Sequence, residues 1–339
     1  MKRYLPIAIG VLLFVLIFRL WKISLADTLA MLRAADWRLL LLALLAFLVM
    51  VYLKGIRWSY LLKMQGVSYP VWDCFLIYMG TLYLGNLTPG RAGDFAKVFY
   101  LKQDLKLSTG KGFTSVLVDR VFDLYILLIL GGLGILMNPM PTDLTSLRMV
   151  SAVKFFFVLL VAVTLLAFNK KIGGGLLKAV FQRLMKQEHR EKMDGLFEEF
   201  HGGMEAFYKP ALLLPVLLTL VSYVSFFGGC YLIALAISLP VNILYLCFCV
   251  SVVNIVSLLT FLGMGTREAA LIFLFGLISI DKDRAMAYSL LLLLVGVILF
   301  SLLGLVCFTL KPIQLEAFSG PSKDPSPGQD KTKEDTQKP

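Results

Sequence analysis

The chain has 339 residues, 58% of them hydrophobic, and its mean hydropathy is +0.81. This composition excludes an ordinary soluble globular protein and places most of the chain in a lipid bilayer. Lys and Arg outnumber Asp and Glu by 33 to 22, a surplus that in a membrane protein sets topology and does not indicate nucleic-acid binding.

Long apolar runs follow one another along the sequence and predict membrane segments. They cover residues 4–20, 37–53, 71–88, 113–137, 149–168, 211–235, 241–262, 268–280 and 285–310. A helix that crosses the hydrocarbon needs about 20 residues, so 268–280 is too short to cross alone. The run 4–20 begins like a signal peptide, but no small-residue cleavage site follows it, which favours an uncleaved first span.

The first of two unusual segments is a helix break at 88–94. The helix breakers in it are Pro89, Gly90 and Gly93. Arg91 and Asp94 would then lie near the start of the returning helix, where free amides and a guanidinium suit a phosphate. The alternative is that Arg91 and Asp94 pair with each other or extend to an interface.

The second break lies at 262–268, and its helix breakers are Gly263 and Gly265. We expect Thr266 to cap the following helix and Glu268 to lie in its first turn. Arg267 either binds an anion or pairs with a carboxylate elsewhere. Broken backbone at membrane depth survives only inside protein or beside a water-filled cavity, and charges there usually mark a substrate or ion path.

The run 113–137 carries Asp119, Arg120 and Asp123, which are neighbours on one helix surface. They form either an internally paired cluster facing the bundle or the wall of a polar cavity. Because two carboxylates exceed one guanidinium, we expect Arg91 or Arg267 to balance them across the cavity. Asp119 and Asp123 are candidates for a proton relay.

The distribution of basic residues distinguishes two topologies. If every run except 268–280 crosses fully, the basic segments 95–112 and 169–210 lie outside, against the positive-inside rule. The rule is met if 71–103 and 241–280 form two re-entrant hairpins that enter from opposite faces. The predicted fold class is therefore an all-α polytopic membrane protein, a helical bundle of about six full spans plus two opposed re-entrant helical hairpins. We interpret Lys54, Arg57 and Trp58 as interfacial anchors that end the second span.

The predicted domain organisation is a transmembrane domain, 1–311, and a disordered cytoplasmic tail, 312–339. Halves 1–137 and 149–310 would form an inverted repeat, a recurring transporter plan, with both termini cytoplasmic. The loop 169–210 predicts a basic amphipathic helix, either on the anionic inner leaflet or packed on the bundle.

No metal or cofactor is expected. The five cysteines lie in apolar stretches without a C-x-x-C or His/Cys spacing, and no Walker-type loop for nucleotide hydrolysis is present.

Several of these motifs carry a family resemblance. Arg57-Trp58, the segment 88–94, Asp119-Arg120 and the segment 263–269 occur in an order that resembles the transmembrane domain of the lysylphosphatidylglycerol synthase and flippase-like membrane family. The resemblance extends nearly to Lys311 and implies an integral inner-membrane protein that moves a lipid or lipid-linked headgroup between leaflets.

The same resemblance sets two further expectations. In bifunctional members a soluble aminoacyl-transferase domain follows the membrane part, whereas about 28 residues follow Lys311 here, so we expect no such domain and no lysyl transfer by this chain. Members commonly carry Glu where this chain has Asp94.

The sequence thus predicts an ATP-independent flippase or scramblase of the plasma (inner) membrane for a phospholipid or polyprenyl-phosphate-linked headgroup. The expected substrate-binding residues are Arg91, Asp94, Arg120, Arg267 and Glu268. Two alternatives remain: a membrane-embedded transferase that uses Asp119 and Asp123 to hold a divalent metal, and a scaffold whose 169–210 loop recruits a separate synthase. Membrane lipids are the expected partners, with a separate synthase or a homo-oligomer also open, and no nucleic acid.

Overall fold

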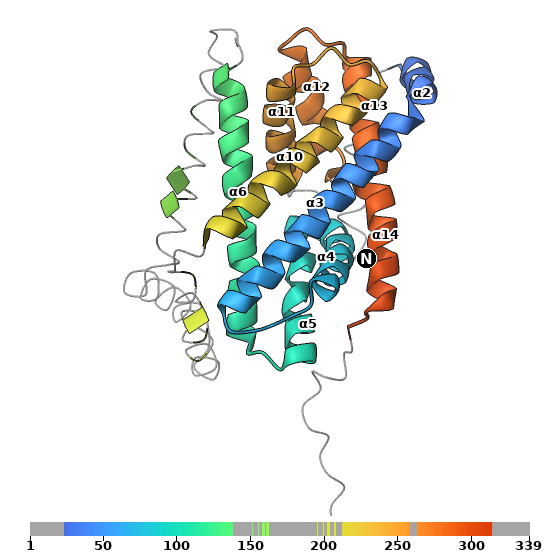
Figure 1. Cartoon of the computed structure of the whole chain (residues 1–339). Helices are drawn as coiled ribbons and strands as arrows, with labels where there is room; N and C mark the ends of the chain where they lie inside the picture. Colours follow the sequence, from blue (N-terminus) through green and yellow to red (C-terminus); the bar gives the residue numbers. More distant parts are fainter. Residues whose placement is uncertain are drawn as a thin grey trace, which may run out of the picture.

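The computed structural model describes residues 24–137, 212–257 and 263–313, with isolated residues between 151 and 207. Every regular element in this part is a helix (Figure 1). The α-helices are α2 (Leu25–Ala34), α3 (Trp37–Met64), α4 (Val71–Asn86), α5 (Ala96–Leu105), α6 (Thr109–Met137), α10 (Leu213–Ala236), α11 (Ile243–Val256), α12 (Thr266–Gly276), α13 (Lys282–Leu293) and α14 (Phe300–Leu310). A 3₁₀ segment, η1 (Pro89–Phe95), joins α4 to α5, and a π-helical segment, η7 (Leu294–Leu299), joins α13 to α14. The predictions for 4–20, 149–168, the loop 169–210 and the tail 312–339 fall largely outside the described residues.

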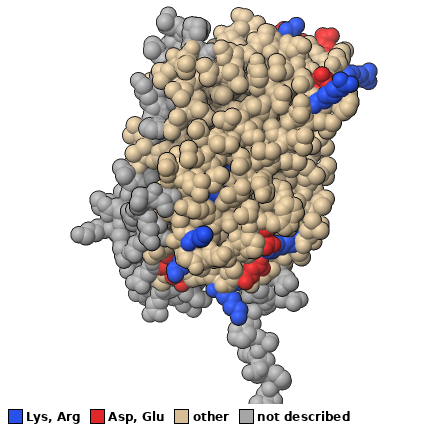
Figure 2. Space-filling model, in the orientation of Figure 1, with Lys and Arg blue, Asp and Glu red and all other residues tan. Residues whose placement is uncertain are grey.

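Three stretches of the described chain are long and apolar enough to cross a bilayer. They are α3 with 28 residues, α10 with 24, and the continuous rod from Lys282 to Leu310 with 29. At 1.5 Å per residue they measure about 36–44 Å, more than the roughly 30 Å of a hydrocarbon core. Figure 2 shows the described charged side chains mostly near the two ends of the visible face, with a nearly uncharged middle. The prediction of an α-helical membrane protein is therefore confirmed.

Helices within residues 24–137 pack in pairs against helices within residues 212–313. α3 lies along α10, α4 along α14, and α6 along α11 (Figure 1). Small residues at these contacts allow the backbones to approach closely, as is common in membrane helices. A Cβ added to Gly304 of α14 would lie 2.6 Å from the carbonyl oxygen of Met79 in α4, so this contact requires glycine.

A polar cluster fastens the end of α14 to α4 and α5. Lys311 Nζ lies 2.8 Å from Tyr69 Oη, 2.8 Å from Asp73 Oδ1 and 2.9 Å from Asp104 Oδ2, and Tyr69 also donates to Asp104. Partial burial alone would raise the pKa of Asp104, but hydrogen bonds from Tyr69 and Lys311 outweigh it and the pKa lies below its usual value. Burial likewise opposes the charge on Lys311, but hydrogen bonds to Asp73 and Asp104 raise its pKa. This cluster holds the C-terminal end of α14 against α4 and α5.

Candidate functional site

The first helix break is a tight turn that folds back on the end of α4. Gly90 and Arg91 have left-handed backbone angles, with φ of 66° and 54°. Glycine adopts this conformation readily, whereas arginine rarely does. The Gly93 N–H donates to Thr88 Oγ1 at 2.7 Å, and a Cβ on Gly93 would overlap the Leu84 carbonyl. The turn holds Arg91 at the mouth of the break, half-buried.

The second break precedes α12 and uses two glycines with positive φ. Gly263 has φ 69° and Gly265 has φ 85°. The expectation that Thr266 caps this helix is wrong, because Gly265 is the N-cap residue and α12 begins at Thr266. Glu268 closes the turn by accepting the Gly265 N–H at 2.6 Å, and the Thr266 hydroxyl donates back to the Gly263 carbonyl at 3.3 Å.

The charged side chains of the second break balance each other. Arg267 pairs directly with Glu268, and both side chains are buried. Arg267 Nε and Glu268 Oε1 each lie 3.2 Å from Ser289 Oγ on α13. The break therefore adds a guanidinium to its surroundings without adding net charge.

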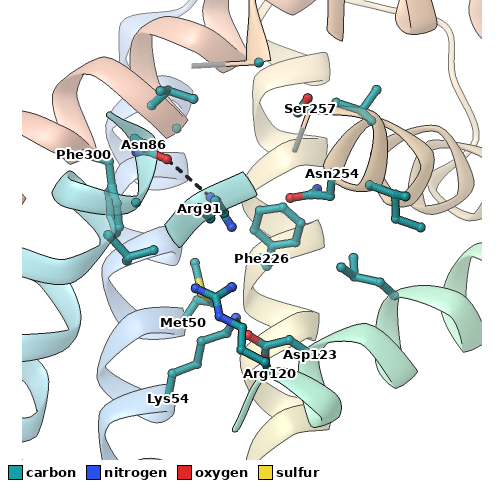
Figure 3. Close-up of a pocket in the computed structure, with 18 of the residues that line it drawn as sticks. Met50, Lys54, Asn86, Arg91, Arg120, Asp123, Phe226, Asn254, Ser257 and Phe300 are labelled. Atoms are coloured by element: carbon teal, nitrogen blue, oxygen red, sulfur yellow. Dashed lines mark hydrogen bonds and ion pairs between the residues drawn. The ribbon is translucent and has the colours of Figure 1, made fainter. Parts of the chain in front are cut away.

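A cavity of about 390 Å³ lies between the two breaks (Figure 3). The first break contributes Thr88, Gly90 and Arg91 to its lining, and the second contributes Gly263 and Arg267. Ser257, at the end of α11, also lines it. Much of the remaining wall is apolar and includes Phe47, Leu82, Leu127, Phe226, Leu292 and Phe300. Its volume falls within the roughly 300–1,000 Å³ that is typical of ligand pockets.

A buried ionic network adjoins this cavity and contributes Lys54 and Asp123 to its wall. Its members are Lys54, Arg57, Lys97, Asp119 and Asp123. Arg57, which is fully buried, donates to Asp119 Oδ1 from Nε at 2.9 Å and from Nη2 at 2.7 Å. Its Nη2 also contacts Asp123 Oδ1 at 2.9 Å. Lys54 Nζ donates to Asp123 Oδ2 at 2.9 Å, and Lys97 Nζ to Asp119 Oδ2 at 3.2 Å. The network links α3, α5 and α6.

Neutral side chains complete the ionic network. Tyr78 of α4 donates to Asp119 Oδ2 at 2.7 Å, and its ring lies 3.1 Å below Lys97 Nζ, a cation–π contact. Thr219 of α10 accepts from Arg57 Nη1 at 2.8 Å, and Tyr223 Oη lies 3.4 Å from Lys54 Nζ. The satisfied network holds five helices in one arrangement, since a buried charge without a partner is costly.

Asp94 and Arg120 connect the first break to α6. The Asp94 carboxylate is 1% exposed and forms an ion pair with Arg120. Gly85 makes room for it, because a Cβ at that position would lie 2.5 Å from Asp94 Oδ1. Arg120 reaches the cavity lining, as do Arg91 and Lys54, and Figure 3 shows these three cations facing one region.

The charges around the cavity leave a positive excess among the described residues. The cations are Lys54, Arg57, Arg91, Lys97, Arg120 and Arg267. The carboxylates are Asp94, Asp119, Asp123 and Glu268. With all ten groups ionised, six positive charges face four negative ones. The cavity is therefore suited to an anion.

The predicted site residues divide into three groups in the structure. Those that line the cavity are Arg91, Arg120, Asp123, Arg267, Gly90 and Gly263. Asp94, Asp119 and Glu268 are buried behind them and hold the cations in place, while Gly93 and Gly265 shape the turns and Pro89 begins η1. The expectation that Arg91 or Arg267 balances Asp119 and Asp123 is wrong, because Arg57, Lys54 and Lys97 do so.

Two residues of the ionic network, Lys54 and Arg57, do not lie where the sequence predicts. The prediction that Lys54 and Arg57 are interfacial anchors is wrong, because their exposed fractions are 8% and 0% and α3 continues beyond them to Met64. Trp58 is also fully buried. The residues Leu61 and Leu62 extend the buried face past the charges, and this continued periodicity was the available indication that the helix does not end at Lys54.

The carboxylates of α6 are poorly placed for a metal. Both oxygens of Asp119 and both of Asp123 accept from Arg57, Lys54, Lys97 or Tyr78. Within the described part of the chain, no three His, Cys, Asp or Glu side chains gather as a possible metal site. This geometry gives the metal-dependent transferase alternative no support.

Comparisons with known proteins indicate a family of membrane proteins over most of the chain. The model of the family described as "Lysylphosphatidylglycerol synthase TM region" matches residues 4–304. A UPF0104 membrane protein of Methanocaldococcus jannaschii is 25% identical over 296 residues, which are 82% of this chain and 87% of that protein. A UPF0104 membrane protein of Methanothermobacter thermautotrophicus is 26% identical over 294 residues, 81% of this chain and 83% of that protein. One of Pyrococcus horikoshii is 33% identical over 127 residues, 36% of this chain and 37% of that protein.

Proposed function

This chain belongs to the lysylphosphatidylglycerol synthase TM-region family of membrane proteins, and we propose that it moves a phosphate-bearing lipid headgroup across the plasma membrane without ATP. The observation that carries the proposal is the cation-rich cavity whose wall includes both helix breaks. Burying an anion in hydrocarbon is expensive, and preorganised cations in a protein cavity offset that cost. The headgroup would cross beside these cations while its hydrocarbon chains stay in lipid.

Arg91, Arg120 and Arg267 would bind the headgroup phosphate. A guanidinium can bind phosphate through two parallel hydrogen bonds, and all three side chains line the cavity. Asp94 and Glu268 would position Arg120 and Arg267, with which they pair. Asp119 and Asp123 would hold the ionic network, and a proton relay through them stays a prediction.

We also propose that the chain is an inverted repeat, and the pairing of its helices supports this. In the proposed topology, α4 with α5 and α11 with α12 are opposed re-entrant hairpins, and the full spans number about six, with both termini cytoplasmic. A two-fold relation would exchange α3 with α10, α4 with α11, and α6 with the rod ending in α14. The packing of α3 on α10 is then self-related, and the pairs α4–α14 and α6–α11 are equivalent. Transporters with this plan bind substrate where broken helices meet.

The test is headgroup translocation in reconstituted vesicles. Chain-labelled phosphatidic acid and phosphatidylglycerol would be incorporated, and loss of fluorescence after external dithionite would report the lipid that reaches the outer leaflet. The wild-type protein should accelerate exchange of at least one anionic lipid over empty vesicles. A wild-type rate equal to that of empty vesicles for every lipid would contradict the proposal.

Arg91→Gln is the informative variant, with Arg38→Gln as its matched control. Among the described residues, the Arg91 guanidinium has one hydrogen bond, to Asn86 Oδ1 at 3.5 Å, so its removal leaves no buried carboxylate unpaired. Arg38 is exposed and lies over the Trp37 ring, away from the cavity. Loss of one charge-assisted contact predicts about a tenfold lower rate for Arg91→Gln and no change for Arg38→Gln.

A further inference from the structure

We infer that the group bound in the cavity is a phosphomonoester, a dianion that carries no cationic substituent. This inference rests on the proposed function and specifies its substrate class. It follows from three features of the cavity: its charge balance, the engagement of its carboxylates, and its apolar wall.

The first feature is the size of the positive excess. Six cations and four carboxylates lie on or directly behind the cavity wall among the described residues. Two negative charges would balance them. A phosphomonoester carries about −1.5 to −2 at pH 7, whereas a simple phosphodiester carries −1 and a phosphocholine or phosphoethanolamine group carries none overall.

The second feature is the lack of a free carboxylate for an ammonium group among the described lining residues. Asp123 is the carboxylate that the described cavity wall presents, and both of its oxygens are engaged, by Arg57 and Lys54 at 2.9 Å each. Asp94 and Glu268 are 1% and 0% exposed and paired with Arg120 and Arg267. A choline, ethanolamine or aminoacyl group would therefore meet cations and find no free carboxylate among the described lining residues.

The third feature distinguishes a lipid from free phosphate. Phe226 and Phe300 line the same cavity as Arg91 (Figure 3), and Leu82 and Leu127 line it as well. This apolar surface adds nothing to the binding of an inorganic ion, but it stabilises a hydrocarbon chain by about 25 cal/mol for each Å² buried. The bound molecule should therefore carry a chain next to its phosphate.

The inference can be tested by binding, independently of transport. Purified full-length protein in phosphatidylcholine nanodiscs would be titrated at pH 7.5 with octyl phosphate, octylphosphocholine and inorganic phosphate, and the heat of binding measured. Octyl phosphate should bind at least about tenfold more tightly than either of the others. Arg91→Gln should weaken octyl phosphate binding by about tenfold, Arg91→Lys by less, and Arg38→Gln should have no effect.

Each other outcome rejects either a defined part of the inference or the proposed function. Equal affinity for octyl phosphate and octylphosphocholine would overturn the phosphomonoester assignment. Equal affinity for octyl phosphate and inorganic phosphate would overturn the lipid assignment. In the vesicle assay, equal rates for phosphatidic acid and zwitterionic lipids would overturn this inference while leaving the proposed function intact. Tight octyl phosphate binding without movement of any lipid would instead reject the proposed function.

Discussion

Replacing Arg57 by methionine tests whether the ionic network holds the helices around the cavity. Arg57 is fully buried and donates to Asp119 at 2.7 and 2.9 Å and to Asp123 at 2.9 Å. After the replacement, Lys54 and Lys97 alone would face the two buried carboxylates. Asp119 Oδ1 and Asp123 Oδ1 would each lose the Arg57 donor, and breaking a buried ionic network in this way costs about 3–5 kcal/mol. We expect a loss of stability of that size in Arg57→Met.

Steric trapping in bicelles would measure this free energy of unfolding without heating the sample. The matched control is Arg38→Met, which removes an exposed arginine from the same helix and should change the stability by less than about 0.5 kcal/mol. If Arg57→Met is as mild as Arg38→Met, the account of the network is wrong.

Two further predictions concern the first break and the end of α14. Gly85→Ala should displace the Asp94 carboxylate, lower stability by about 1–3 kcal/mol and slow translocation, whereas Gly228→Ala, with open space around its Cβ, should do neither; equal unfolding curves for the two variants would contradict this. Lys311→Met should lower the melting temperature over a bounded pH range. Because the pKa of Asp104 is lowered, its stabilising pair is present above the usual value of about 4 and is lost as the pH falls through the lowered pKa. Because the pKa of Lys311 is raised, its contribution is present below about 10 and is lost as the pH rises through the raised pKa. The difference from wild type should thus shrink at both ends of a pH 3–11 series, and a constant difference would refute the assignment.

Features fixed by local chemistry could be predicted from the sequence. Apolar runs place α10 at 213–236, close to the predicted 211–235, because a hydrophobic stretch in lipid has few alternatives to a helix. Gly90 and Gly263 adopt positive φ inside otherwise helical stretches, as their residue type allows. The family was also predicted correctly from the order of short motifs, and its match covers residues 4–304.

Features that depend on partners distant in the sequence could not be predicted. Arg57 bonds residues 62 and 66 positions away, and nothing within α3 indicates that these carboxylates face it. Lys97 belongs to the basic segment 95–112 that sets topology in the sequence prediction, yet its ammonium group lies over the Tyr78 ring and contacts Asp119. The pairing of Asp94 with Arg120 likewise depends on how η1 packs against α6. Choosing among several possible partners for each charge requires the tertiary structure.

Thiol modification of Ser257→Cys tests most directly whether the cavity is both open to water and positively charged. Ser257 lines the cavity beside the second break, whereas Val51 is fully buried in α3 and provides the unreactive control as Val51→Cys. An anionic, water-soluble methanethiosulfonate reagent should modify Ser257→Cys faster than a cationic reagent of similar size, and adding Arg91→Gln should reduce this preference. A cysteine at Ser257 that reacts no faster than one at Val51, or that reacts faster with the cationic reagent, would contradict the account.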